Sequence, residues 1–190
     1  NIDIPIIETK PQVTEEILSA MNITAKIGEF STRFNKELKE RTENIKLAAE
    51  ILNGHVIAPG EVFSFNEVVG ERTGEKGYKE APIFVNNETV PGIGGGICQL
   101  SSTLYNVALL LDLEIVERSN HSLPVSYVPL GRDATVNYNT IDFKFKNITH
   151  GHLLIHCEVE DDTLKVCIFG NEKWDKNIEL HTEIVKTIPP

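Results

Sequence analysis

The sequence predicts an α+β domain built mainly from antiparallel strands, with two principal helices at about residues 36–53 and 98–112 and a C-terminal β-hairpin. Helical periodicity is confined to a few stretches, whereas most other apolar segments are short and alternate with polar residues. Strand pairs joined by short turns recur along the chain, and this pattern is typical of antiparallel hairpins rather than of a parallel sheet.

The chain divides into three predicted parts: 1–22, a linker and short helix from a preceding region; 23–172, the main domain; and 173–190, a C-terminal strand and tail. In the first part, Thr14 begins the short helix with a partial capping box. In the last part, Ile178, Leu180 and Ile184 suggest one more strand.

The first half of the domain predicts a strand over Lys26–Phe34 and then the first principal helix, over Leu38–Leu52. The helix is indicated by apolar residues at helical spacing, and Gly54 follows as a C-cap. A strand end and a Pro-Gly turn then come before an alternating strand at Val62–Phe65.

The middle of the chain predicts a polar loop punctuated by glycines, followed by a hairpin that joins Ile83–Val85 to Val90 through residues 86–88. The second principal helix runs over Gln99–Leu111. A short strand at Ile115–Val116 and a longer stretch of strand character over Asp133–Lys146 follow it.

The C-terminal hairpin, Leu153–Phe169, can be tested for register. With Asp161-Asp162 as a two-residue turn, apolar residues meet apolar residues on one face, as a half-buried hairpin requires. The predicted pairs are Glu160 with Thr163, Val159 with Leu164, Cys157 with Val166, Ile155 with Ile168, and His156 with Cys167. This register keeps Cys157 and Cys167 separate and reduced, whereas a three-residue loop would make them direct partners.

Composition excludes several classes of protein. The chain has 18 basic and 28 acidic residues, a net charge of −10, which argues against nucleic acid as the main partner. The longest apolar stretch, Val107–Leu111, is far shorter than the roughly 20 residues of a membrane span. Because the chain begins at Asn1 without a methionine, we expect it to be a segment of a longer protein, so the missing leader says little about location.

One segment has the features of a reactive site: Gly94-Gly95-Gly96-Ile97-Cys98, directly before a predicted helix. A thiol there lies at the positive end of the helix dipole, which favours the thiolate. Backbone N–H groups around it can bind an oxyanion, for which we select Gly95, Gly96, Ile97 and Gln99. Cys98 is therefore a candidate nucleophile, although a buried structural cysteine at a tight turn is an equally good interpretation.

A cysteine nucleophile needs a base, and His121 is the best candidate because it lies in a polar turn between two predicted strands. Arg118 is a candidate to bind a carboxylate, with a surface ion pair as the alternative, and Arg132 is a second candidate. Asp133 is a candidate to orient the imidazole, and a turn-stabilising role is at least as good an explanation.

The order of these motifs over about residues 28–170 resembles the VanW family. The matching motifs are Arg41-x-x-Asn44-Ile45, Leu52-Asn53-Gly54, Pro59-Gly60-Glu61-x-Phe63-Ser64-Phe65-Asn66, Gly70-x-Arg72, Gly77-Tyr78, Gly94-Gly95-Gly96-Ile97-Cys98-Gln99-Leu100-Ser101-Ser102-Thr103-Leu104-Tyr105-Asn106, Glu117-Arg118-x-x-His121-Ser122, Tyr127-Val128-Pro129-x-Gly131-x-Asp133-Ala134 and Asp142-Phe143-x-Phe145-x-Asn147. The resemblance implies that residues 23–172 form a VanW-like catalytic domain.

The resemblance implies a cell-wall L,D-transpeptidase of Gram-positive bacteria, linked to vancomycin resistance, with Cys98 as nucleophile and His121 as base. Its partners would be peptidoglycan stem peptides, and the intact protein would be membrane-anchored on the extracellular face of the cell membrane or in the cell wall. No cofactor and no metal are implied. The expected substrate-binding residues are Arg118, Arg132, Ser101, Ser102, Tyr105 and Asp133. The similarity to YkuD-type L,D-transpeptidases is limited to a cysteine near glycine and a histidine base, which indicates convergent chemistry.

Two other functions remain open at this stage. The chain could be a non-catalytic module that binds peptidoglycan stem peptides, in which case Cys98 would form no thioester. A metal site made by Cys98, His121 and Asp133 is a weaker alternative, because the spacing of these residues matches no common ligand pattern.

Overall fold

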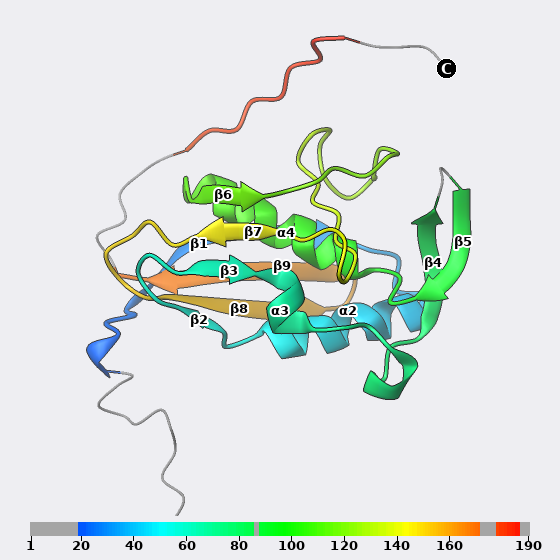
Figure 1. Cartoon of the computed structure of the whole chain (residues 1–190), viewed down its shortest axis with the longest axis horizontal. Helices are drawn as coiled ribbons and strands as arrows, with labels where there is room; N and C mark the ends of the chain where they lie inside the picture. Colours follow the sequence, from blue (N-terminus) through cyan, green and yellow to red (C-terminus); the bar gives the residue numbers. More distant parts are fainter. Residues whose placement is uncertain (1–18, 86–87, 172–177, 187–190) are drawn as a thin grey trace, which may run out of the picture.

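The computed structural model describes residues 19–85, 88–171 and 178–186, and it confirms the α+β class (Figure 1). The largest sheet has four antiparallel strands in the order β1-β9-β8-β2. Their bounds are β1 Ala25–Arg33, β9 Thr163–Gly170, β8 Leu153–Glu160 and β2 Val56–Ile57. Segments from both ends of the domain therefore lie side by side in one sheet.

Two smaller antiparallel sheets complete the strand content of the described residues. One has the order β3-β7-β6, with β3 at Val62–Ser64, β7 at Lys144–Lys146 and β6 at Glu114–Glu117. The other is the hairpin of β4, Glu80–Val85, and β5, Glu88–Ile93, which stands at one end of the molecule (Figure 1).

Helices α2, Lys39–Leu52, and α4, Ile97–Leu110, supply most of the buried helical surface. Helix α4 packs against β1 and β9, α2 packs against β8, and the two helices contact each other. The core between them is apolar and includes Ile45, Leu100 and Leu104, all with no exposed surface. Within the described part of the chain, no helix is both long and apolar enough to cross a membrane.

The predicted hairpin register is confirmed at every pair. Cys157 lies opposite Val166 and His156 lies opposite Cys167, with Asp161 and Asp162 forming the turn. The structure has three free cysteines, so Cys157 and Cys167 are not bridged. The predicted strand at 26–34, the first helix and the Pro-Gly turn are also confirmed, with bounds that shift by a residue or so.

Two strand predictions are wrong. Of the segment 133–146, only β7 is a strand, and the preceding residues form two isolated bridges, Ser119 with Thr135 and Asn137 with Ile141. Ala134, Thr135 and Val136 instead contact side chains of α4, and Ile141 and Asp142 bond Ser64 and Asn66. Residues 178–186 form no strand, because no neighbouring strand pairs with them and Val185 is 92% exposed.

Two short helices were not predicted: α3, Phe65–Val69, and the 3-10 turn η1, Gly74–Lys76. Strand β3 ends at Ser64 because the Ser64 hydroxyl accepts a hydrogen bond from Glu67 N–H and caps α3. The predicted helix start at Thr14 and the turn at residues 86–87 lie outside the described residues.

The β4–β5 hairpin is fastened to α2 through a buried asparagine. The Asn44 amide donates to the carbonyls of Lys79 and Gly95, both at 3.0 Å, and accepts from Lys79 N–H at 2.7 Å. At Gly95 the backbone passes so close to β4 that an added Cβ would lie 2.7 Å from the Pro82 carbonyl oxygen. A side chain at residue 95 therefore cannot be accommodated without moving the hairpin.

We predict that Gly95→Ala lowers the free energy of unfolding by about 1–3 kcal/mol, which for this chain length is a fall in melting temperature of roughly 2–10 °C. Gly74→Ala is the matched control, because a Cβ there meets nothing within 4 Å. Thermal unfolding followed by circular dichroism measures both. Equal melting temperatures for the two variants would contradict the close approach at Gly95.

Candidate active site

The glycine run forms a tight turn that ends in α4. Gly94 and Gly96 have φ angles of 80° and 107°, which favour glycine over every other residue. Helix α4 then begins at Ile97, with no acidic residue in its first turn and no side chain capping its N-terminus. The positive end of a 14-residue helix is thus left without a negative protein group.

Cys98 occupies the first turn of α4 and is partly buried. Its Sγ lies 3.6 Å from Thr135 Oγ1 and 3.5 Å from the Val136 carbonyl oxygen. Thr135 and Val136 belong to the segment predicted as a strand. In the structure this segment contacts the first turn of α4. The thiol is therefore held by contacts from a distant part of the sequence while keeping some access to solvent.

His121 and Asp133 form a close pair. His121 Nδ1 lies 2.6 Å from Asp133 Oδ2, and the His121 backbone N–H donates to the same oxygen at 2.7 Å. Their side chains are only 7% and 10% exposed. A carboxylate acceptor fixes the proton on Nδ1, which leaves Nε2 as the nitrogen for a second partner.

That second partner is the Cys98 thiol, whose interaction with His121 shifts the pKa of both groups. Burial by itself raises the pKa of Cys98, but the interaction with His121 outweighs it, so the pKa lies below the ordinary thiol value. Burial likewise lowers the pKa of His121, yet its interactions with Cys98 and Asp133 bring that pKa above the ordinary value. Both shifts favour a thiolate–imidazolium pair.

Arg118 holds Asp133 in place. Its Nε donates to the Asp133 carbonyl at 2.7 Å, and its Nη2 lies 3.1 Å from both Asp133 Oδ1 and the Gly131 carbonyl. The guanidinium also lies over the Tyr105 ring, 5.3 Å from its centroid. Tyr105 is only 9% exposed and packs against Phe143, so both residues act here as support for Asp133.

Ser101 and Ser102 are fully buried in this structure, and their hydroxyl groups bond the backbone. The Ser101 hydroxyl donates to the Ala134 carbonyl at 2.7 Å, and the Ser102 hydroxyl accepts from Ala134 N–H at 2.9 Å. These bonds fasten the residue after Asp133 to α4. The two serines therefore set the distance between the Asp133 segment and the helix that carries Cys98.

Arg132 and Gln99 also make structural contacts. Arg132 Nε donates to Asn106 Oδ1 at 2.7 Å, eight residues and therefore about 12 Å along the helix from Cys98. The Gln99 side chain is buried and links α4 to β1 through Thr32 Oγ1 and the Arg33 carbonyl. A substrate-binding role for Arg132 gains no support from this position.

The predicted oxyanion donors divide into two groups. Ile97 N–H donates to the Gly94 carbonyl at 3.3 Å and Gln99 N–H to the Gly96 carbonyl at 3.0 Å, so both are used within the turn. No hydrogen bond within the described residues uses the N–H groups of Gly95, Gly96 or Cys98. These three groups are the available donors, and that of Cys98 itself was not predicted.

Three residues near the thiol were missed as site residues, although all lie in the motifs quoted above. Arg41, Arg72 and Tyr127 are each close enough to Cys98 to interact with it electrostatically. Burial raises the pKa of Tyr127 far above its ordinary value. Because these residues lie 57, 26 and 29 positions from Cys98 in the printed sequence, only the motif order could have suggested them.

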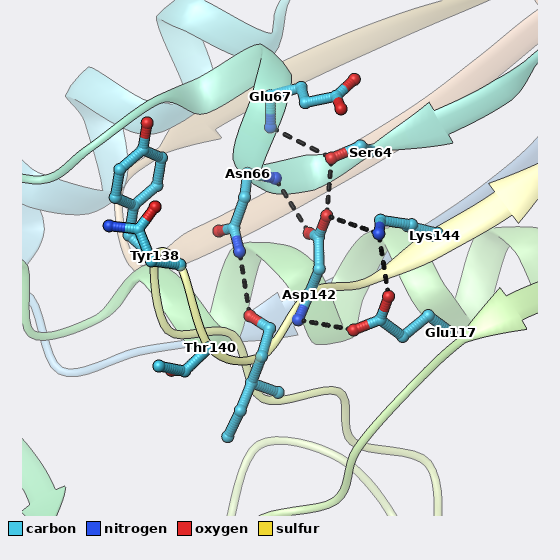
Figure 2. A pocket seen from close by; sticks show the side chains of 10 residues that line it. Ser64, Asn66, Glu67, Glu117, Tyr138, Thr140, Asp142 and Lys144 are labelled. Carbon is cyan, nitrogen blue, oxygen red and sulfur yellow. Dashed lines mark hydrogen bonds and ion pairs between the residues drawn. The ribbon is translucent and has the colours of Figure 1, made fainter.

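A polar pocket of about 500 Å³ opens beside the loop that follows Val136 (Figure 2). Its lining residues are Ser64, Asn66, Glu67, Glu117, Tyr138, Asn139, Thr140, Ile141, Asp142 and Lys144. Figure 2 shows Asp142 between Ser64 and Lys144, and the Ser64 hydroxyl donates to it at 2.6 Å. None of the predicted site residues lines this pocket, but Asn66 connects it to Arg72, whose Nη1 donates to Asn66 Oδ1 at 2.7 Å.

The arrangement of Cys98, His121 and Asp133 differs from that of metal ligands. The imidazole hydrogen-bonds the carboxylate and interacts electrostatically with the thiol, as in a nucleophile–base–acid relay. Across the ranges that the structure describes, no group of three or more His, Cys, Asp or Glu side chains has the arrangement of a metal site.

The site lies within the part of the chain that a known protein family matches. The family described as VanW like protein matches residues 40–169, which include every site residue described above. The uncharacterized protein YoaR of Bacillus subtilis is 42% identical over 188 residues, or 99% of this chain and 62% of that protein. The vancomycin B-type resistance protein VanW of Enterococcus faecalis is 35% identical over 135 residues, or 68% of this chain and 49% of that protein.

This chain therefore spans less than two thirds of the length of either relative. No solved structure matches it.

We predict that a neutral alkylating reagent such as iodoacetamide labels Cys98 at pH 7 and leaves the other two cysteines largely unmodified. Burial raises the pKa of Cys157 to about 12, and the pKa of Cys167 is also raised by burial, whereas that of Cys98 is lowered. Because only the thiolate reacts, labelling should be selective and its pH midpoint should lie below that of an ordinary thiol. Peptide mass spectrometry measures the labelling at each cysteine.

We further predict that Asp133→Asn slows Cys98 labelling at pH 7 by about three- to tenfold, because the Cys98 pKa rises. Without the carboxylate, the imidazolium is less stable, so the His121 pKa falls and the thiolate loses its partner. Asp161→Asn, in the exposed hairpin turn, is the control and should label at the wild-type rate. An unchanged pH midpoint in Asp133→Asn would exclude coupling of Asp133 to the thiol.

Proposed function

Because the chain belongs to the VanW family, whose match covers residues 40–169, we propose that it is a peptidoglycan L,D-transpeptidase with a cysteine nucleophile. The observation that carries the proposal is the relay of Cys98, His121 and Asp133 at the uncapped N-terminus of α4. A nucleophile, a base and an acid that orients the base are the groups that acyl transfer requires.

In the first step, the Cys98 thiolate attacks the carbonyl of the bond between an L-centre, such as that of meso-diaminopimelate, and the terminal D-Ala of a stem tetrapeptide. The N–H groups of Gly95, Gly96 and Cys98 would stabilise the negative charge on the carbonyl oxygen. Collapse of the intermediate breaks the peptide bond, and His121 gives its Nε2 proton to the departing D-Ala amine. A thioester on Cys98 remains.

In the second step, an amine of another stem attacks the thioester carbonyl, and His121 takes the proton that this amine loses. An amide cross-link forms, the carbon–sulfur bond breaks, and the thiolate–imidazolium pair is restored. Water in place of the amine would give L,D-carboxypeptidase activity by the same route. Asp133 stays charged throughout, because the ring and backbone of His121 hold its pKa below the ordinary value despite burial.

The location of the substrate determines the location that we propose for the intact protein. Peptidoglycan stems are found outside the cell membrane, so the domain would act on the extracellular face or in the cell wall, carried by a membrane anchor elsewhere in the protein. The relative named for vancomycin B-type resistance is in keeping with a role in the cell wall.

The alternative is a module that binds stem peptides without reacting. It differs from the enzyme in one observable: Cys98 would never carry an acyl group. The lowered pKa of Cys98 favours the enzyme, because a binding module has no need for a thiolate beside a histidine.

The test is incubation of purified muropeptides with the wild-type protein and with Cys98→Ala. We expect D-Ala release, cross-linked product and a trapped acyl adduct on Cys98 from the wild type, and none of these from Cys98→Ala. Cys157→Ala is the matched control, since Cys157 lies in the hairpin, and it should keep wild-type activity. Equal product from Cys98→Ala and wild type would exclude Cys98 as the nucleophile of a transpeptidase. Muropeptide binding without any adduct would support the binding module.

A further inference from the structure

Two arginines flank the turn that presents Cys98. Arg72 packs against Gly94, where an added Cβ would lie 3.1 Å from the Arg72 Cβ. Arg41 packs against Gly96, where an added Cβ would lie 3.0 Å from the Arg41 Cγ. The missing side chains of the two glycines therefore allow both arginines to approach the turn, and both interact electrostatically with Cys98.

Neither arginine has a carboxylate partner. Among the described residues, the ion pairs involve other basic groups, although the chain has ten more acidic than basic residues. Asp142 influences Arg72 only at longer range and forms its own bonds with Ser64 and with the Asn66 N–H. Burial lowers the pKa of both arginines, which means that the neighbouring negative groups do not fully offset the desolvation of either guanidinium.

Buried polar groups at this place also lack hydrogen-bond partners. Arg72 uses Nη1 to bond Asn66, but its Nη2 is buried and has no partner. The hydroxyl of Tyr78, a residue that is 2% exposed, is likewise unpartnered, and it is close enough to Arg72 to interact with it. Unsatisfied buried donors are rare in folded proteins and call for an explanation.

We propose that Arg72 and Arg41 form the subsite that binds the terminal carboxylate of the donor peptide. This subsite lies beside the Cys98 thiol, which attacks the scissile carbonyl of the same peptide. The inference rests on the proposed function and names the group that the enzyme recognises: a free carboxylate one residue beyond the scissile bond. A guanidinium with a free N–H matches a carboxylate oxygen in charge and geometry. Arg72 Nη2 is the unpartnered donor that would meet the carboxylate oxygen.

This assignment differs from the expectation based on sequence. Arg118 is committed to the Asp133 carboxylate, and Arg132 bonds Asn106, two turns along α4 from the thiol. Arg41 and Arg72 also bond amide oxygens, those of Gln99 and Asn66, but they lie beside the turn that presents Cys98. Arg72 and Arg41 are the described arginines that combine proximity to Cys98 with the lack of an acidic partner. A single residue between the scissile bond and the carboxylate is also the spacing that a D-Ala leaving group presents.

The experiment compares two synthetic stem tetrapeptides that differ only at the C-terminus, one with a free carboxylate and one with an amide. Wild-type protein should acylate Cys98 about 10- to 100-fold faster with the acid, as loss of a charged hydrogen bond predicts. Arg72→Gln should bring the two rates to within about threefold, by slowing the acid and not the amide. Arg72→Lys should restore part of the preference, because it keeps the charge.

Arg33→Gln is the matched control, because this arginine is exposed on β1. It should keep the full preference for the acid. Thermal unfolding and iodoacetamide labelling of each variant show whether the fold and the thiolate survive the change. If Arg72→Gln slows labelling but keeps the preference for the acid, Arg72 supports the thiolate and the proposal is overturned. The proposal is also overturned if Arg132→Gln, and not Arg72→Gln, loses the preference.

Equilibrium binding to Cys98→Ala separates the inference from the proposed reaction. Calorimetry should show tighter binding of the acid than of the amide, with the difference lost in Cys98→Ala/Arg72→Gln. This difference together with no acylation of wild type would leave the carboxylate subsite intact and remove the transpeptidase. Acylation at equal rates with the acid and the amide, together with equal binding of both, would keep the transpeptidase and remove the carboxylate subsite.

Discussion

The carboxylate of Asp133 is the interaction on which the arrangement of the site depends. It accepts hydrogen bonds from the ring and the backbone of His121 and from Arg118, and all three side chains are largely buried. A buried carboxylate without these partners would be protonated or would unfold its surroundings. The position of the imidazole, and through it the state of the thiol, therefore follows from how firmly Asp133 is held.

Helix α4 does most of that holding. The residues one turn after Cys98, Ser101 and Ser102, bond both backbone groups of Ala134, so the same helix carries the nucleophile and positions the acid. On the other side of the thiol, the glycine turn lets α2 and the β4–β5 hairpin pack against the start of the helix. Asn44 fastens that turn, since its amide bonds Gly95 and Lys79. The site is thus assembled by contacts between segments that are far apart in the sequence.

Sequence analysis predicted the fold where local periodicity is strong. The register of β8 and β9 followed from matching apolar residues across a two-residue turn, and every predicted pair is present. The prediction was wrong for the residues before β7, where Ala134 and Val136 bond side chains of α4 instead of pairing with a strand. It also failed at 178–186, where apolar residues alternate but no partner strand is present. Alternation alone does not distinguish these cases.

The sequence by itself determined that Cys98 follows a glycine turn and begins a helix, and it selected His121 and Asp133 as partners, because these depend on local chemistry and on motif order. The tertiary structure decided which arginines support Asp133 and α4 and which lie beside the thiol. Arg118 and Arg132, adjacent to the selected residues, turn out to be occupied by Asp133 and Asn106. Arg41 and Arg72 approach the thiol from other elements, and their lack of an acidic partner depends on burial and packing, which no spacing along the chain records.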